Sequence, residues 1–243
     1  MPKVVGYHRP ASVREAVELL GQPSAAVLAG GTRVNATPFG SPIVAVDIQA
    51  LGLRSIEPAG PSRVRLGAMV TLQQMVDSSL LPEVLRECAR REEPSTLRTL
   101  ATIGGTAAAG GWESEVVTAL LVADAQVTIE SRTGSRTVTL PELLADCDLL
   151  VGGLITSVDV ATDGAWSVDR TGRTPGDRAI VCAVARRGND GVVRLAASGV
   201  SPTPILLSVD TPLTPPADFR GSSEYRGHVA RTLLSRVSKA VLA

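Results

Sequence analysis

Aromatic residues are scarce in this chain of 243 residues, which has two tryptophans, two tyrosines and two phenylalanines. Proteins that bind single-stranded nucleic acids stack the bases on aromatic side chains, so we expect no such surface here. An excess of positive charge is also missing, because 24 Lys and Arg residues balance 24 Asp and Glu residues. A nucleic-acid partner or an anionic membrane partner is therefore not indicated.

Metal-binding residues are equally few. The three cysteines, Cys88, Cys147 and Cys182, show no C-x-x-C pairing, and His8 and His228 are the only histidines. Iron-sulfur clusters and structural zinc usually take about four Cys or His ligands, so we expect no metal. We interpret the cysteines as reduced, buried thiols and the histidines as surface residues.

Long apolar segments are absent too. No apolar run approaches the roughly 18 residues that a membrane span needs, and no signal peptide precedes Tyr7. We therefore expect a soluble, cytoplasmic protein. Its length is sufficient for one large domain or two modest ones.

What the chain does have is a stretch without bulky side chains, at residues 102–111 (TIGGTAAAGG). Glycine has no Cβ to hold a ligand away, and it lets consecutive N–H groups turn inward around an anion. We interpret this stretch as a loop that leads into a helix, because the apolar residues at 116, 117, 120 and 121 share one helical face. A helix N-terminus suits a phosphate.

A second bend of this kind lies upstream. Residues 25–29 (AAVLA) are typical of a short buried strand, and Gly30, Gly31, Thr32 and Arg33 follow directly. Neither bend has the glycine spacing of a Rossmann fingerprint or of a P-loop. Together the two bends could hold the ends of a diphosphate. The alternative is that each is a tight turn that lets a helix and a strand pack closely.

The remaining pattern predicts alternating helices and strands up to residue 161 and a different region after it. Predicted strands are residues 43–48, 63–66, 126–130, 136–140 and 154–160, followed by 179–187 and 192–200. Predicted helices cover residues 12–20, 71–75, 82–91 and 141–144, with a last one near the C-terminus. Residues 162–164 and 170–176 look like loops, and residues 201–219 like a connector, so we place a domain boundary near 161.

Three motifs resemble a known family. They are residues 28–32 (LAGGT), 66–72 (LGAMVTL) and 97–105 (LRTLATIGG), in the family's order and at about its spacing. The family is the FAD-binding medium subunit, or domain, of the molybdenum hydroxylases, which include xanthine dehydrogenases and aerobic carbon monoxide dehydrogenases. The resemblance implies an α+β fold: a two-lobed, PCMH-like FAD-binding domain at 1–161, then a small domain of antiparallel strands and a helix at 162–243.

The resemblance also implies which residues bind FAD. In the first bend they are Val27, Leu28, Ala29, Gly30, Gly31, Thr32, Arg33 and Val34. In the second bend they are Thr102, Ile103, Gly104, Gly105 and Thr106. Glu115 falls where the family holds a ribose hydroxyl, and Ile155 where an aliphatic side chain contacts the flavin. No side chain is expected to act as a catalytic acid, base or nucleophile.

Several positions depart from the family pattern. Arg33 stands where the family usually has an acidic residue, and it would either pair with a phosphate or face solvent. Thr106 replaces an asparagine. Glu115 replaces an aspartate, and it could instead be an acid that stabilises a helix N-terminus. A basic residue that reaches the cofactor in some members corresponds to Asp169, beside Arg170.

The function that follows from the resemblance is electron transfer. Such a subunit would pass electrons from a molybdenum-cofactor large subunit and a [2Fe-2S] small subunit through FAD to NAD, a quinone or oxygen. The alternatives are a stand-alone flavin enzyme acting on a small molecule, and a relative without flavin that serves as an assembly or binding module. We expect Gly104→Val to fold but bind little FAD, and Arg173→Ala to leave the flavin content unchanged.

Overall fold

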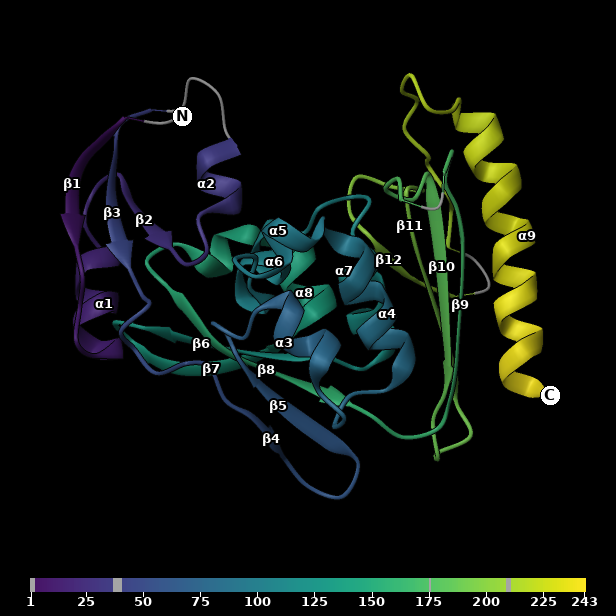
Figure 1. Cartoon of the computed structure of the whole chain (residues 1–243), viewed down its shortest axis with the longest axis horizontal. Helices are drawn as coiled ribbons and strands as arrows, with labels where there is room; N and C mark the ends of the chain where they lie inside the picture. The colour runs from purple at the N-terminus through teal and green to yellow at the C-terminus, as the bar shows by residue number, and fades with distance from the viewer. Residues whose placement is uncertain (1–2, 37–40, 175, 209–210) are drawn as a thin grey trace.

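The computed structural model describes residues 3–36, 41–174, 176–208 and 211–243, and it contains three sheets (Figure 1). Their strand orders are β1-β3-β2, β4-β5-β8-β6-β7 and β12-β11-β10-β9. The smallest sheet and the C-terminal sheet lie at opposite ends of the molecule, with the five-stranded sheet and most of the helices between them. Within the described residues, no helix is long and apolar enough to cross a membrane.

The first lobe is a small parallel sheet, in which β3 pairs with both β1 and β2. Its elements are β1 (Val4–His8), α1 (Val13–Leu20), β2 (Ala25–Leu28), α2 (Thr32–Ala36) and β3 (Ile43–Asp47). The predicted start of α1 is confirmed, because the Ser12 side chain accepts a hydrogen bond from the N–H of Glu15. Ala16, Val17 and Leu20 of α1 pack in one apolar cluster with Val46 of β3.

The second lobe is an antiparallel sheet covered by helices. Its strands are β4 (Ile56–Pro58), β5 (Arg63–Gly67), β6 (Gln126–Ser131), β7 (Gly134–Thr139) and β8 (Leu154–Ala161). Its helices are α3 (Leu72–Asp77), α4 (Glu83–Glu92), α5 (Ser95–Arg98), α6 (Ile103–Ala109), α7 (Glu115–Val122), α8 (Leu140–Ala145) and the short η1 (Cys147–Leu150). Every side chain of α7 is buried, so this helix forms the centre of the molecule.

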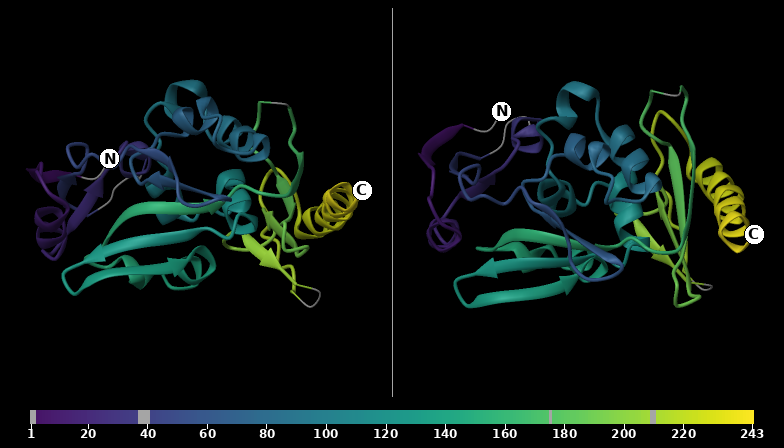
Figure 2. Two further views of the ribbon diagram at one scale, coloured as in Figure 1. Left: turned by 90° about the horizontal axis from the view of Figure 1, so that it is seen from below. Right: turned by 60° about the horizontal axis from the view of Figure 1, so that its bottom comes forward.

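The C-terminal region is an antiparallel sheet of β9 (Ala165–Thr171), β10 (Val181–Arg187), β11 (Val193–Ser198) and β12 (Ile205–Leu207). The long helix α9 (Ser223–Leu242) covers its outer face, as Figure 2 shows. Successive side chains of a strand point to opposite faces. Cys182 and Val184 of β10 accordingly join the main core, whereas Val181, Ala183 and Ala185 pack in the cluster that contains α9.

Three local predictions differ from the structure. Residues 103–109 are not a loop but helix α6, which Thr102 caps by accepting the N–H of Gly105 and which ends at Gly110 with a φ of 52°. The predicted loop at residues 170–176 begins too early, because β9 continues through Thr171 in register with Val181 of β10. The predicted connector also contributes an edge strand, β12.

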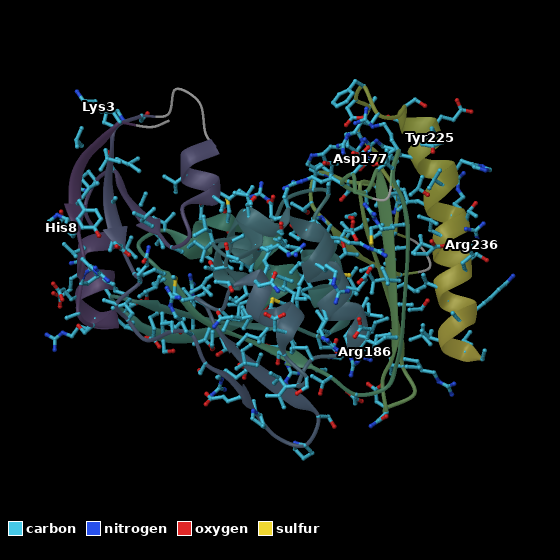
Figure 3. All side chains as sticks on the ribbon, viewed as in Figure 1. Lys3, His8, Asp177, Arg186, Tyr225 and Arg236 are labelled. Carbon is cyan, nitrogen blue, oxygen red and sulfur yellow. The ribbon has the colours of Figure 1, made fainter. Side chains whose placement is uncertain are left out.

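The predicted surface positions of the histidines are confirmed: both are exposed, and His8 lies at the outer edge of the first lobe (Figure 3). The prediction for the cysteines is correct for Cys88 and Cys182, which are free and buried, and wrong for the exposed Cys147. Burial raises the pKa of the two buried thiols well above the usual value, so they remain protonated. Among the described residues, no group of three or more His, Cys, Asp and Glu side chains could hold a metal ion.

Candidate functional site

The two glycine bends lie against each other, although some 70 residues separate them in the chain. A Cβ built on Gly30 would lie 1.7 Å from the carbonyl oxygen of Leu100, so only glycine permits this approach. Gly31 follows with a φ of 73°, a left-handed conformation that glycine adopts without strain. The close-packing interpretation therefore holds for Gly30, but it does not exclude a ligand.

A cavity of about 340 Å³ opens where the bends meet. This volume lies within the roughly 300–1,000 Å³ typical of small-molecule sites. Most of the predicted residues line it: Val27, Ala29, Gly30, Gly31, Thr32, Arg33, Val34, Thr102, Gly104, Gly105, Thr106 and Ile155. The exceptions are Leu28, Ile103 and Glu115, which are not among its lining residues.

The sequence did not single out the other lining residues as a site. They are Ile48, Ala68, Glu93, Ala101, Ala108, Ala109, Leu150, Gly153 and Leu154. Ala68 belongs to one of the three family motifs, and Ala108 and Ala109 of α6 belong to the stretch without bulky side chains. The sequence pattern could therefore have indicated these three residues as part of the site. Leu150 and Gly153 come from the segment before β8, where the sequence gives no indication of a ligand.

The first N–H groups of the second bend make hydrogen bonds within the protein. The N–H of Ile103 donates to the carbonyl of Val70 at 2.9 Å, and the N–H of Gly104 donates to that of Ala68 at 3.0 Å. The N–H of Gly105 donates to the Thr102 side chain at 3.2 Å. The turn between β5 and α3 thus accepts two of these N–H groups, and the Thr102 hydroxyl accepts the third.

The first bend differs in this respect. The described residues provide no hydrogen-bond acceptor for the N–H groups of Gly30, Gly31 or Thr32. Strand β2 ends at Leu28, whose carbonyl accepts the N–H of Ile48 as the last bond of the ladder. The backbone that follows leaves the sheet and borders the cavity with its donors unpaired.

Gly104 and Gly105 have different roles. A Cβ on Gly104 would lie 2.7 Å from the Cβ of Ala68 and 2.9 Å from its carbonyl oxygen, so this glycine lets α6 pack on the end of β5. A Cβ on Gly105 would meet the Thr102 hydroxyl at 3.1 Å and, among the described residues, no further atom within 4 Å outside the adjoining backbone of its own helix. Gly105 therefore presents bare backbone to the cavity.

Among the described residues, two charged side chains line the cavity, Arg33 and Glu93. The Glu93 carboxylate forms an ion pair with Arg178, which comes from the loop before β10. Arg33 extends from α2 toward the connection between α6 and α7. The Nη2 atom of Arg33 lies 3.2 Å from the position that a Cβ on Gly111 would occupy.

Glu115 lies away from the cavity, buried in the first turn of α7. Its carboxylate pairs with Nε of Arg170 at 2.9 Å. Burial raises the pKa of Glu115 to about 7, and the charge of Arg170 opposes this shift. Nearby, the carboxylate of the buried Glu92 accepts the N–H of Val116 at 3.1 Å, so an acid from α4 caps α7.

Comparison with known proteins identifies the family. A family model described as the FAD binding domain in molybdopterin dehydrogenase matches residues 3–161. This chain belongs to that family. The α+β fold and the family expected from the sequence are thereby confirmed. The chain is an FAD-dependent oxidoreductase of the subunit type, and its cofactor is FAD.

Its relatives match along nearly the whole chain. The uncharacterized protein YgfM of Escherichia coli K12 is 29% identical over 248 residues, which cover 94% of this chain and 93% of YgfM. The carbon monoxide dehydrogenase medium chain of Hydrogenophaga pseudoflava is 27% identical, and the match covers 100% of this chain and 99% of that one. The solved structure of that organism's carbon monoxide dehydrogenase, in a form lacking the Mo-pyranopterin moiety, has a TM-score of 0.89 at 25% identity. The match covers 100% of this chain and 98% of that one.

The residues around the cavity fit FAD. The first bend offers unpaired N–H donors to a phosphate, and Arg33 offers a positive charge. Gly105 leaves space that a side chain would otherwise fill. Val27, Ile48 and Ile155 give the cavity apolar surface of the kind against which ring systems pack.

Proposed function

We propose that this chain is the FAD-binding medium subunit of a molybdenum hydroxylase, which passes electrons from molybdenum and iron-sulfur partners to NAD, a quinone or oxygen. The single observation that carries the proposal is the cavity at the junction of the two glycine bends. FAD, when bound, supplies the redox chemistry, because it exchanges electrons with both one-electron and two-electron partners. The chain itself supplies binding and orientation.

The residues divide into three groups by their proposed contact with FAD. Gly30, Gly31 and Thr32 bind a phosphate through their N–H groups, and the Cβ-free backbone of Gly105 lies against the same part of the cofactor. Val27 and Ile155 pack against its rings.

Residues 1–161 form the flavin-binding domain in this assignment, and residues 162–243 form a second domain.

Glu115 does not serve as a direct ribose ligand in this assignment, because its carboxylate is paired with Arg170. Its proposed role is to hold the N-terminus of α7 against β9 through the ion pair with Arg170. The departure from the family's aspartate therefore need not weaken FAD binding.

Partner subunits are part of the proposal because the reaction needs centres that the described residues do not provide. They contain no cluster of metal-ligating side chains. The relatives named above include a medium chain of a carbon monoxide dehydrogenase, which supports a heteromeric assembly.

The test is purification of the tagged full-length chain from its native host, followed by metal analysis and a visible spectrum. We expect a yellow complex that contains molybdenum and iron, and whose flavin is reduced when the molybdenum subunit receives its substrate. A lone yellow protein that an added small molecule reduces directly would favour a stand-alone flavin enzyme. A colourless protein that takes up no added FAD would favour a non-catalytic relative.

A further inference from the structure

A separate groove lies between the first and second lobes, and the proposed function does not use it. Its volume is about 860 Å³, within the range typical of small-molecule sites. One side is α1, which contacts β6 and β8 of the second lobe (Figure 1). The other side is the β6–β7 hairpin, with Glu130, Arg132 and Gly134. The groove and the FAD cavity share no lining residue among those described.

The apolar part of the groove belongs to a packed core. Val13, Val17 and Leu53 line the groove. The same three side chains belong to the apolar cluster that contains Val46 of β3 and Leu154 of β8. Because this cluster joins the two lobes, these side chains are held in place before any ligand arrives. An aliphatic ligand would therefore meet a preformed surface.

The charged side chains of the groove balance one another in number, with two arginines and two glutamates among the described lining residues. Arg14 and Glu18 of α1 pair with each other at 3.2 Å. The side chains of Glu130 and Arg132 form no hydrogen bond or ion pair with any residue that the structure describes. The groove therefore offers one unpaired negative charge and one unpaired positive charge.

The position of Arg132 keeps these two charges apart. A Cβ on Gly21, directly after α1, would lie 2.8 Å from the Nη1 atom of Arg132 and 3.1 Å from its Cδ atom. The arginine thus extends from the hairpin along the C-terminal end of α1, whose own last turn has no basic residue. Glu130 lies two positions earlier, in β6. The hairpin side of the groove accordingly presents opposite charges that do not neutralise each other.

We propose that this groove binds a small zwitterion with an aliphatic body, of the chemical class of the ω-amino acids. The ammonium group of the ligand pairs with Glu130, and its carboxylate pairs with Arg132. Its methylene chain packs on the apolar side chains of α1 and Leu53. A simple anion or cation leaves one of the two charges unpaired, and a zwitterion without a chain leaves the apolar surface uncovered. This inference does not depend on the binding of FAD.

The experiment records proton–nitrogen correlation NMR spectra of the full-length protein during titration with ε-aminocaproate. Three matched probes lack one feature each: caproate lacks the ammonium group, hexylamine lacks the carboxylate, and glycine lacks the chain. We expect ε-aminocaproate to shift the amide signals of the groove, with a dissociation constant in the millimolar range, as for other ligands of this size. Each matched probe should bind at least about twofold more weakly, because it loses one contact.

Two variants assign the two charges. Arg132→Gln should weaken the binding of ε-aminocaproate by about two- to fivefold, as for the loss of an exposed ion pair, without weakening that of hexylamine. Glu130→Gln should weaken the binding of ε-aminocaproate by a similar factor without weakening that of caproate. The controls are Arg231→Gln and Glu57→Gln, which change exposed residues outside the groove and should match the wild type.

Three results would overturn the proposal. The first is a spectrum in which tens of millimolar ε-aminocaproate leaves the groove signals in place. The second is binding of caproate or hexylamine as tight as that of ε-aminocaproate. The third is an equal loss of affinity for every probe in Arg132→Gln, because the arginine would then only shape the groove. The same spectra show whether each variant is folded.

Discussion

Glu93 places a carboxylate on the cavity wall, and its ion pair with Arg178 keeps that charge from repelling an anionic ligand. We predict that Arg178→Ala weakens FAD binding by about two- to tenfold, a modest effect because the Arg178 side chain is 42% exposed and the pair is partly screened. The double variant Glu93→Gln with Arg178→Ala should regain most of the affinity. Fluorescence titration of FAD checks this. A double variant as weak as Arg178→Ala alone would show that Arg178 acts in some other way.

Glu115 makes the stability of the protein depend on pH. Its pKa in the folded state is about 7, above the usual value of 4.5, so the folded state holds this proton more tightly than the unfolded state. The contribution of Glu115 to the free energy of unfolding should therefore be largest below pH 4.5. It should fall as the pH rises to about 7, by on the order of 1–3 kcal/mol.

Glu115→Gln should reduce this decline, because glutamine resembles the protonated acid. Urea unfolding at pH 5 and pH 8 measures the difference. The matched control is Glu18→Gln, in which an exposed acid of α1 is changed and the wild-type dependence should remain. The same decline in Glu115→Gln as in the wild type would contradict the assignment.

At the residue scale, many of the residues that line the cavity were expected from the sequence, because the glycine pairs drew attention to the two bends and the family resemblance implied the individual positions. The sequence could not predict which N–H groups remain unpaired. That depends on the carbonyls of Ala68 and Val70, which the turn after β5 brings against α6. The ion pair of Glu93 could likewise not be predicted, since its partner Arg178 is 85 residues away in the chain.

At the scale of elements, α6 couples the cavity to the five-stranded sheet. The predicted effect of Gly104→Val now has a different cause, because the added side chain would meet Ala68 rather than the ligand. We predict that even Gly104→Ala lowers the free energy of unfolding by about 1–3 kcal/mol through overpacking.

Gly105→Ala is the matched control for this prediction. Its Cβ meets only the Thr102 hydroxyl, and alanine favours a helix over glycine by up to about 1 kcal/mol. Its stability should therefore equal or slightly exceed that of the wild type in urea unfolding. Equal destabilisation of the two variants would refute the distinction between the two glycines.

The elements that the sequence missed have identifiable causes. Thr102 and the alanines at 107–109 favour a helix, but the glycines between them suggested a loop. These glycines are tolerated in α6 because the approach to Ala68 requires one of them. Strand β9 is flanked by loop-forming residues, and its length is determined by pairing with β10 from Thr171 to Ala165.

At the scale of the whole molecule, the site exists only where separate parts meet. The first lobe supplies one glycine bend and Arg33, and the second lobe supplies α6 and Ile155. The loop before β10 adds Arg178, and the inner face of the C-terminal sheet shares the main core with α7. The sequence predicted these parts and their order from the family motifs, whereas the shared core between them depends on long-range packing.

The central claim is that FAD occupies the cavity between the two bends. The most direct measurement is the flavin content of the reconstituted full-length protein, determined from its visible absorbance, for the wild type and for Gly105→Leu. Outside the adjoining backbone of α6, the Cβ of a leucine there would meet only the Thr102 hydroxyl among the described residues, and Gly105 lines the cavity. We predict stoichiometric FAD in the wild type and little in a folded Gly105→Leu. A wild type that takes up no FAD, or a Gly105→Leu variant with full occupancy, would contradict the claim.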